Sequence, residues 1–170
     1  MSVSDLRREY GAAGLVEADL DPSPFKQFAS WFQQALDAQL AEPNAMTLAT
    51  VSRDGKPSAR IVLLKGFDEQ GFVFYTNYES PKALELSENP HAALVFAWIE
   101  LERQVRITGQ TSRVSRQESE AYFCSRPEGS QLGAWASRQS EVISGREVLE
   151  NRLEELRTEY ANKPIPLPSD

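Results

Sequence analysis

The sequence predicts a mainly β fold, a small antiparallel barrel with helices around it. About five stretches have the apolar, β-branched character of strands: residues 46–52, 57–67, 72–77, 91–100 and 103–114. Short turns join neighbouring stretches, and the Asp54-Gly55 pair between the first two is a strong hairpin signal. Strands joined in this way pair antiparallel, with helices packed around them. Five strands leave edges to cover, so dimerisation would be physically sensible.

Four helices are predicted, over residues 21–40, 80–89, 115–125 and 144–160. The first, second and last have a helix-start signal, and residues 115–125 look helical up to Arg126-Pro127. Ser23 is the expected N-cap of the first helix, with a proline at its first position. The last helix is expected to start at Ser144, because Ser144 and Glu147 have the spacing of a capping box. Residues 126–144 are rich in glycine and serine and are predicted to be irregular. Residues 163–170 are rich in proline and cannot form a helix.

Length and composition limit the classes of function. A chain of 170 residues is expected to form one domain, residues 22–170, preceded by a loosely held arm, residues 1–21. Its net charge of −7 argues against a nucleic-acid-binding or membrane-surface protein. The sequence has no run that resembles a signal peptide or spans a bilayer. A cytoplasmic location is expected, because the single cysteine, Cys124, cannot form an internal disulfide.

The same composition restricts the chemistry. One cysteine and one histidine, His91, argue against a metal site built from these residues, and no metal is expected. His91 follows Asn-Pro at the start of an apolar stretch and is interpreted as a strand-start residue. If the protein is an enzyme, a bound cofactor is therefore expected to supply the reactive atom.

The first candidate site is the stretch "RIVLLK", residues 60–65, an apolar run with a cation at each end. Successive strand residues point to opposite faces, so Arg60 and Lys65 should not face the same point. Either both charges are solvated strand ends, or an anionic ligand lies along the strand and contacts two surfaces. The residues alone favour the first interpretation slightly.

The second candidate is Ser80-Pro81-Lys82. A helix N-terminus attracts anions through its unpaired N–H groups, and Lys82 adds a full positive charge. Just before it lie Tyr75 and Thr76. A phosphate site and an ordinary surface lysine are both consistent with this pattern.

A third candidate combines Tyr122 and Arg126, four residues apart at a helix end, with Ser130 in the loop expected to follow. They could hold a small anion through charge-assisted hydrogen bonds. The alternative is an arginine that binds the last carbonyl groups of its own helix. Gln104 lies on the expected polar face of the last strand and is a candidate donor to a flat heterocycle.

Taken in order along the chain, these pieces resemble the pyridoxine/pyridoxamine 5′-phosphate oxidase family, which has an FMN-binding split β-barrel. The matching segments cover nearly the whole chain: "LRREY" (6–10), "RIVLLK" (60–65), "VFYTN" (73–77), "KA" (82–83), "LERQV" (101–105), "YF" to "SRP" (122–127), "SQLGAW" (130–135) and "QS" (139–140). The combination of "RIVLLK", "LERQV" and "SQLGAW" is specific to this family.

The resemblance implies a role for each matching residue. Those that correspond to FMN contacts are Arg60, Ile61, Val62, Leu63, Leu64, Lys65, Tyr75, Thr76, Lys82, Gln104, Gln139 and Ser140. The apolar residues 61–64 would form a wall for the flavin. Those that correspond to catalytic or substrate-binding residues are Lys65, Tyr122, Arg126, Ser130, Arg8 and Tyr10. In this family FMN lies at a homodimer interface, and the N-terminal arm closes over the substrate.

The implied reaction is oxidation of pyridoxine or pyridoxamine 5′-phosphate at C4′ to pyridoxal 5′-phosphate. Hydride passes to FMN, and O2 reoxidises the flavin. The partners implied are phosphorylated B6 vitamers, O2 and a second copy of the chain. Two alternatives stay open: a slow FMN- or pyridoxal-phosphate-binding protein, and a related split-barrel flavin reductase that uses a nicotinamide donor.

The sequence departs from the family pattern in two places. Many members have arginine directly before the helix lysine, where this chain has Pro81. Loss of one phosphate contact would cost about tenfold in FMN affinity. The family also continues past "PLPS" into a Trp-Gly-Gly strand and an Arg-Leu-His-Asp run, whereas this sequence ends at Asp170. From these residues alone, we expect a mostly present FMN site and an incomplete substrate site.

Overall fold

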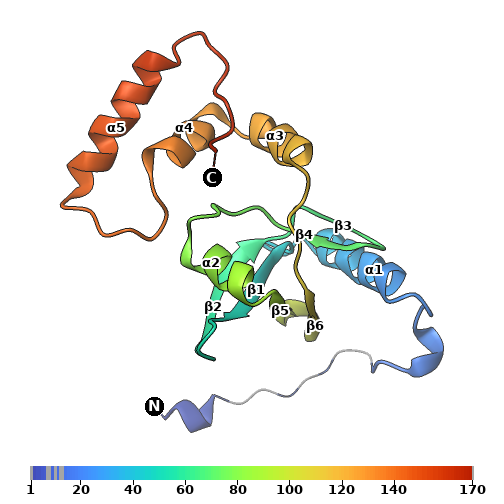
Figure 1. Cartoon of the computed structure of the whole chain (residues 1–170). Coiled ribbons are helices and arrows are strands. Elements are labelled where there is room, and N and C mark those ends of the chain that lie inside the picture. The colour runs from blue at the N-terminus through green and yellow to red at the C-terminus, as the bar shows by residue number, and fades with distance from the viewer. Residues whose placement is uncertain (1, 7–8, 10, 12–13, 170) are drawn as a thin grey trace. The chain divides into compact units, whose positions relative to one another are not determined.

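The protein was analysed as a computed structural model that describes residues 2–6, 9, 11 and 14–169 (Figure 1). These residues form two compact units. The first contains the described residues up to 48 together with residues 60–74 and 93–107. The second contains residues 49–59, 75–92 and the described residues from 108 onward. Each unit has its own apolar core, and each is described separately below.

The strands form two antiparallel sheets. The larger has the order β2-β1-β5-β6, made by Ala45–Val51 (β1), Pro57–Leu63 (β2), His91–Trp98 (β5) and Arg103–Gln110 (β6). The smaller pairs Gly66–Asp68 (β3) with Gly71–Val73 (β4), with Phe67 opposite Phe72. The prediction of antiparallel strands with peripheral helices is confirmed. The prediction of five strands is wrong in detail, since residues 57–67 form two strands.

The break between β2 and β3 has a hydrogen-bonding cause. The N–H of Leu64 donates to the carbonyl of Asn44 at 2.8 Å, whereas the N–H of Lys65 donates to the carbonyl of Val73 at 2.8 Å. The chain therefore changes hydrogen-bonding partner between two consecutive residues, and the strand ends there. The next predicted strand is also shorter than expected, because β4 stops at Val73 and Tyr75 and Thr76 lie outside it.

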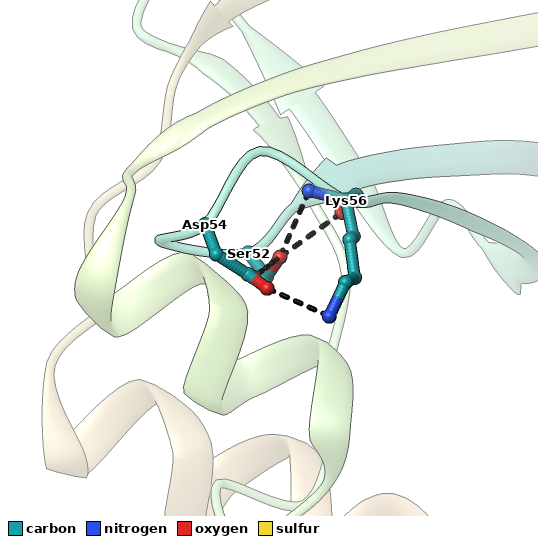
Figure 2. Close-up of polar contacts among 3 residues, drawn as sticks. All are labelled: Ser52, Asp54 and Lys56. Carbon is teal, nitrogen blue, oxygen red and sulfur yellow. Dashed lines mark hydrogen bonds and ion pairs between the residues drawn. The ribbon is translucent and has the colours of Figure 1, made fainter.

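The hairpin predicted from Asp54-Gly55 is confirmed between β1 and β2. The N–H of Ser52 donates to the carbonyl of Lys56 at 3.0 Å, and Gly55 adopts a positive φ of 84°. Figure 2 shows the side-chain contacts: the Ser52 hydroxyl donates to Asp54 at 2.6 Å, and Lys56 pairs with Asp54 at 2.7 Å. The Lys56 ammonium, and secondly the Ser52 hydroxyl, lower the pKa of Asp54.

The core of the first unit is aromatic and forms around the first helix, Pro24–Asp37 (α1). As predicted, Ser23 is its N-cap, and the side chain accepts from the N–H of Lys26 at 3.5 Å. Phe28 is buried, and its ring contacts Phe67 and Phe72 edge-on, with centroids 4.8 and 4.9 Å apart. The β3-β4 ribbon thus packs on α1 through aromatic side chains.

The remaining α-helices lie in the second unit: Pro81–Glu88 (α2), Arg116–Ser125 (α3), Glu128–Ala136 (α4) and Arg146–Glu159 (α5) (Figure 1). Short 3-10 helices cover Val3–Asp5, Glu17–Asp19 and Ile99–Leu101. A core cluster joins α3, α4, α5 and the C-terminal segment through Phe123, Leu132, Leu156 and Ile165. The prediction that residues 163–170 are not helical is confirmed for the residues described, 163–169.

Two predictions about these helices are wrong. The stretch expected to be irregular contains α4, because burial of Leu132 in the core outweighs the weak helix propensity of the glycines at 129 and 133. The last helix starts at Arg146 with Gly145 as N-cap, and no side chain caps it. Ser144 therefore lies one residue too early for the expected capping box with Glu147.

Within the part of the chain that the structure describes, no helix is long and apolar enough to cross a membrane.

Candidate functional site

The clearest polar cluster lies at the N-terminus of α2. The Lys82 ammonium donates to the hydroxyl of Thr76 at 3.2 Å and to Oε1 of Gln139 at 2.7 Å. Gln139 follows α4 and is 57 residues away in sequence. The fold thus brings together three residues that the sequence analysis assigned to the same ligand. Ser140 follows Gln139 directly and has a positive φ of 71°.

The loop before α2 holds Thr76 in place through its own hydrogen bonds. The Asn77 side chain accepts from the N–H of Glu79 at 2.6 Å, and the Ser80 hydroxyl donates to the carbonyl of Asn77 at 2.7 Å. Ser80 is fully buried, and its hydroxyl lies 3.4 Å from that of Thr76. Pro81 occupies the first helical position, where its fixed φ suits the helix. This ordered turn aims the Thr76 hydroxyl at Lys82.

The donor set of this cluster suits a phosphate group. It combines an ammonium, a hydroxyl and the N-terminal end of a helix, whose dipole favours negative charge. Lys82 is half-buried, so its charge is screened less than that of a fully exposed lysine. The chemistry of these residues therefore fits the phosphate end of a nucleotide cofactor such as FMN.

A pair of stacked tyrosines forms a second feature of the same unit. The rings of Tyr75 and Tyr122 are nearly parallel, 5° apart in plane, with centroids at 3.7 Å. The hydroxyl of Tyr75 donates to Glu118 at 3.3 Å. Burial, and secondly the Glu118 charge, raise the pKa of Tyr75. The sequence analysis missed Glu118; its only signal is its position four residues before Tyr122 on α3.

The structure changes the interpretation of Arg126 and Ser130. Arg126 is the C-cap of α3 with an extended backbone, so it does not share a helix face with Tyr122. Its guanidinium lies 5.8 Å from the centre of the Phe123 ring, and its carbonyl accepts from the Gln131 side chain at 2.7 Å. Ser130 lies in α4 and not in a flexible loop. The two residues therefore lie on either side of the short break between α3 and α4.

The stretch 60–65 lies in the first unit, and only residues 60–63 belong to β2. Arg60 is half-buried and donates to the carbonyl of Leu48 at 3.2 Å. Val62 and Leu63 are half-buried, whereas Ile61 is 64% exposed and Leu64 only 5% exposed. The four apolar residues therefore do not form a wall on one face. Lys65 is exposed and lies beyond the end of β2.

The remaining predicted residues are separate from these features. Gln104 is exposed on β6, and its neighbour Val105 is half-buried, which confirms the predicted alternation of that strand. Arg8 and Tyr10 lie outside the described residues. Among residues with described positions, no group of three or more histidine, cysteine, aspartate or glutamate side chains could hold a metal ion.

Comparisons with known proteins identify the family of this chain. Residues 32–160 match the family described as pyridoxamine 5′-phosphate oxidase. A relative from Nostoc sp. (strain PCC 7120), named pyridoxine/pyridoxamine 5′-phosphate oxidase, is 61% identical over 168 residues, which cover 99% of this chain and 78% of the relative.

Solved structures support the fold. PhzG from Burkholderia lata, solved in complex with tetrahydrophenazine-1-carboxylic acid, superposes with a TM-score of 0.86 and 28% identity, over 93% of this chain and 78% of that chain. An FMN-binding protein from Nostoc punctiforme, described as related to pyridoxamine 5′-phosphate oxidase, gives a TM-score of 0.59 and 21% identity over 75% of this chain and 70% of that chain. The matches in sequence and fold place this chain in the pyridoxamine 5′-phosphate oxidase family.

Proposed function

We propose that this chain oxidises pyridoxine 5′-phosphate and pyridoxamine 5′-phosphate to pyridoxal 5′-phosphate, with FMN as cofactor and O2 as electron acceptor. The observation that carries the proposal is the cluster of Lys82 with Thr76 and Gln139. These residues match the family's FMN contacts, and their hydrogen bonds bring them to one point. The 61% identity to a relative named for this activity supports the same conclusion.

Lys82 and Thr76, at the N-terminal end of α2, are the residues that would hold the FMN phosphate. Arg60, Lys65 and Gln104 are proposed as further contacts. When bound, FMN supplies the acceptor for the hydride that leaves C4′ of the vitamer, and O2 then takes up the two electrons as hydrogen peroxide. Loss of hydride from pyridoxine 5′-phosphate gives the aldehyde directly, whereas pyridoxamine 5′-phosphate gives an imine that water hydrolyses with release of ammonia. The chain itself needs no nucleophile for this chemistry.

The substrate side of the proposal assigns binding and orientation to the protein. Arg126 and Ser130, with Tyr122 and Lys65, would bind the substrate phosphate by charge-assisted hydrogen bonds. Binding the phosphate, which lies away from the reacting carbon, fixes the position of C4′. Binding energy contributes to the rate in this way. Arg8 and Tyr10 are proposed to close over the substrate with the N-terminal arm.

We further propose a homodimer with FMN at its interface, whose strands belong to a split barrel. The four-stranded sheet ends on β2 and β6, and a second copy could cover such edges. A reducing cytoplasm is the proposed compartment, since Cys124 is the only cysteine.

The proposal is tested by anaerobic stopped-flow absorbance, with the FMN-loaded protein mixed with pyridoxamine 5′-phosphate. Bleaching of the oxidised flavin band is expected, and pyridoxamine without its phosphate should bleach the flavin far more slowly at equal concentration. Retained absorbance with both vitamers would refute the oxidase and favour a binding protein. Rapid bleaching by a nicotinamide cofactor, with no response to vitamers, would favour a flavin reductase.

A further inference from the structure

Helix α2 carries Lys82 but has little apolar anchoring of its own. It is eight residues long, and none of its side chains is fully buried. Of its apolar residues, Leu84 is 53% exposed, and Ala83 and Leu86 are half-buried. Short helices are marginal without tertiary packing, so polar contacts must contribute much to the position of α2.

One such contact joins α2 to the hairpin of β1 and β2. The carboxylate of Glu85 accepts from the hydroxyl of Ser58, at 2.6 Å for one oxygen and 2.9 Å for the other. It also accepts from the hydroxyl of Thr50, a residue that is only 3% exposed. Thr50 lies on β1 and Ser58 on β2, and their hydroxyl oxygens are 3.2 Å apart. Two neighbouring strands thus present hydroxyl donors to one carboxylate of the helix.

This arrangement fixes α2 in two ways. Each hydroxyl has a single proton, so donation to the carboxylate orients both hydroxyls toward the helix. Hydrogen bonds to an ionised group are also stronger than neutral ones. Glu85 lies three residues after Lys82, less than one turn along a rigid helix. A shift of the Glu85 end would therefore move the Lys82 backbone as well.

We propose that Glu85 is a positioning residue that sets where Lys82 and the N-terminus of α2 meet the FMN phosphate. This inference rests on the proposed function, because it takes Lys82 as a phosphate contact. Glu85 acts through α2 and does not touch the cofactor.

The charge of Glu85 allows positioning to be distinguished from a direct electrostatic effect on FMN. A carboxylate one turn from an anion site repels the anion, so by charge alone its removal would tighten FMN binding. Positioning predicts the opposite sign for Glu85→Ala, namely weaker FMN binding. Glu85→Gln loses the charge but keeps the shape and can still exchange hydrogen bonds with two hydroxyls. It is therefore expected to rescue most of the affinity.

The test measures dissociation constants of FMN and of riboflavin, which lacks the phosphate, for the purified apoprotein by quenching of flavin fluorescence. The ratio of the two constants isolates the phosphate contribution. Glu85→Ala is expected to lower the preference for FMN about tenfold, and Glu85→Gln by less than about threefold. Glu88→Ala removes the same charge from an exposed position on the same helix and should leave the ratio unchanged.

A double variant tests whether Glu85 acts through Lys82. In the Lys82→Met background, Glu85→Ala should change the FMN preference by less than about threefold, because Lys82 is absent and only the N-terminus of α2 remains to be positioned. A merely structural role would weaken FMN and riboflavin equally and leave the ratio as in the wild type. That result, or tighter FMN binding in Glu85→Ala, would overturn the proposal.

If Glu85→Ala does not fold, as judged by circular dichroism, Ser58→Ala provides the test. It removes one donor without a change of charge and should lower the FMN preference about threefold. If Ser58→Ala leaves the ratio unchanged while Lys82→Met lowers it, the role of Glu85 is refuted and the phosphate site of the proposed function stands. A wild type without preference for FMN over riboflavin would overturn both this inference and the phosphate site of the proposed function.

Discussion

Lys82→Met tests the phosphate site most directly. Methionine keeps much of the length and apolar stem of lysine but removes the ammonium, which donates to Thr76 and Gln139. A hydrogen bond between charged groups contributes about 1.5–3 kcal/mol, which corresponds to roughly 10- to 150-fold in affinity. Because Lys82 is half-buried and not fully buried, water screens part of this interaction. We therefore expect FMN to bind about 10- to 30-fold more weakly.

The assay is flavin fluorescence quenching at two salt concentrations. Wild-type affinity for FMN should fall as salt rises, and the Lys82→Met variant should be less sensitive to salt. Lys56→Met is the matched control, because it removes the same charge from an exposed residue in the hairpin turn. Its ion pair with Asp54 is solvent-exposed and contributes little energy. An FMN affinity within twofold of wild type in a folded Lys82→Met protein would refute the assignment of this cluster to the phosphate.

Three further predictions concern the framework around the site. Phe28→Ala should lower the free energy of unfolding in urea by about 3–5 kcal/mol, because the Phe28 ring is buried among aromatic partners; a loss below about 1 kcal/mol would contradict that packing. Tyr75 should titrate above its usual value of 10.0, and Glu118→Gln should lower its pKa only partly, because burial is the larger cause. Neutral Tyr75 therefore stabilises the folded protein below pH 10, and this contribution is lost as the pH rises through the raised pKa. Ultraviolet titration of the protein and of its Tyr75→Phe variant would measure the shift. Gly55→Ala should lower the free energy of unfolding in urea by about 1 kcal/mol. The cause is the positive φ of Gly55 alone, since an added Cβ meets nothing within 4 Å. An unchanged free energy of unfolding would contradict the turn geometry.

Local sequence signals predicted the elements well where neighbouring residues decide the structure. The Asp54-Gly55 turn, the Ser23 N-cap and the start of the β5 strand at His91 all depend on a few adjacent residues, and all three are confirmed. The family resemblance named Thr76, Lys82 and Gln139 without knowledge of their distances. The assignments of Arg60, Lys65, Gln104 and the other cofactor residues stay predictions.

Predictions failed where distant residues decide the structure. Residues 57–67 look like one strand, but the change of backbone partner at Leu64 and Lys65 depends on Asn44 and Val73. The α4 segment contains two glycines and looks irregular, yet burial of Leu132 against α5 and the C-terminal segment makes it helical.

By itself, the sequence determined the family, the antiparallel strands with their helices, and the residue types of the candidate site, because short-range periodicity, turn chemistry and ordered motifs carry that information. Only the tertiary structure decided which of these residues meet. The contact of Lys82 with Gln139, the stack of Tyr75 on Tyr122 and the attachment of Glu85 to two strands join residues far apart in sequence. Such contacts depend on how the elements pack, which no local pattern encodes.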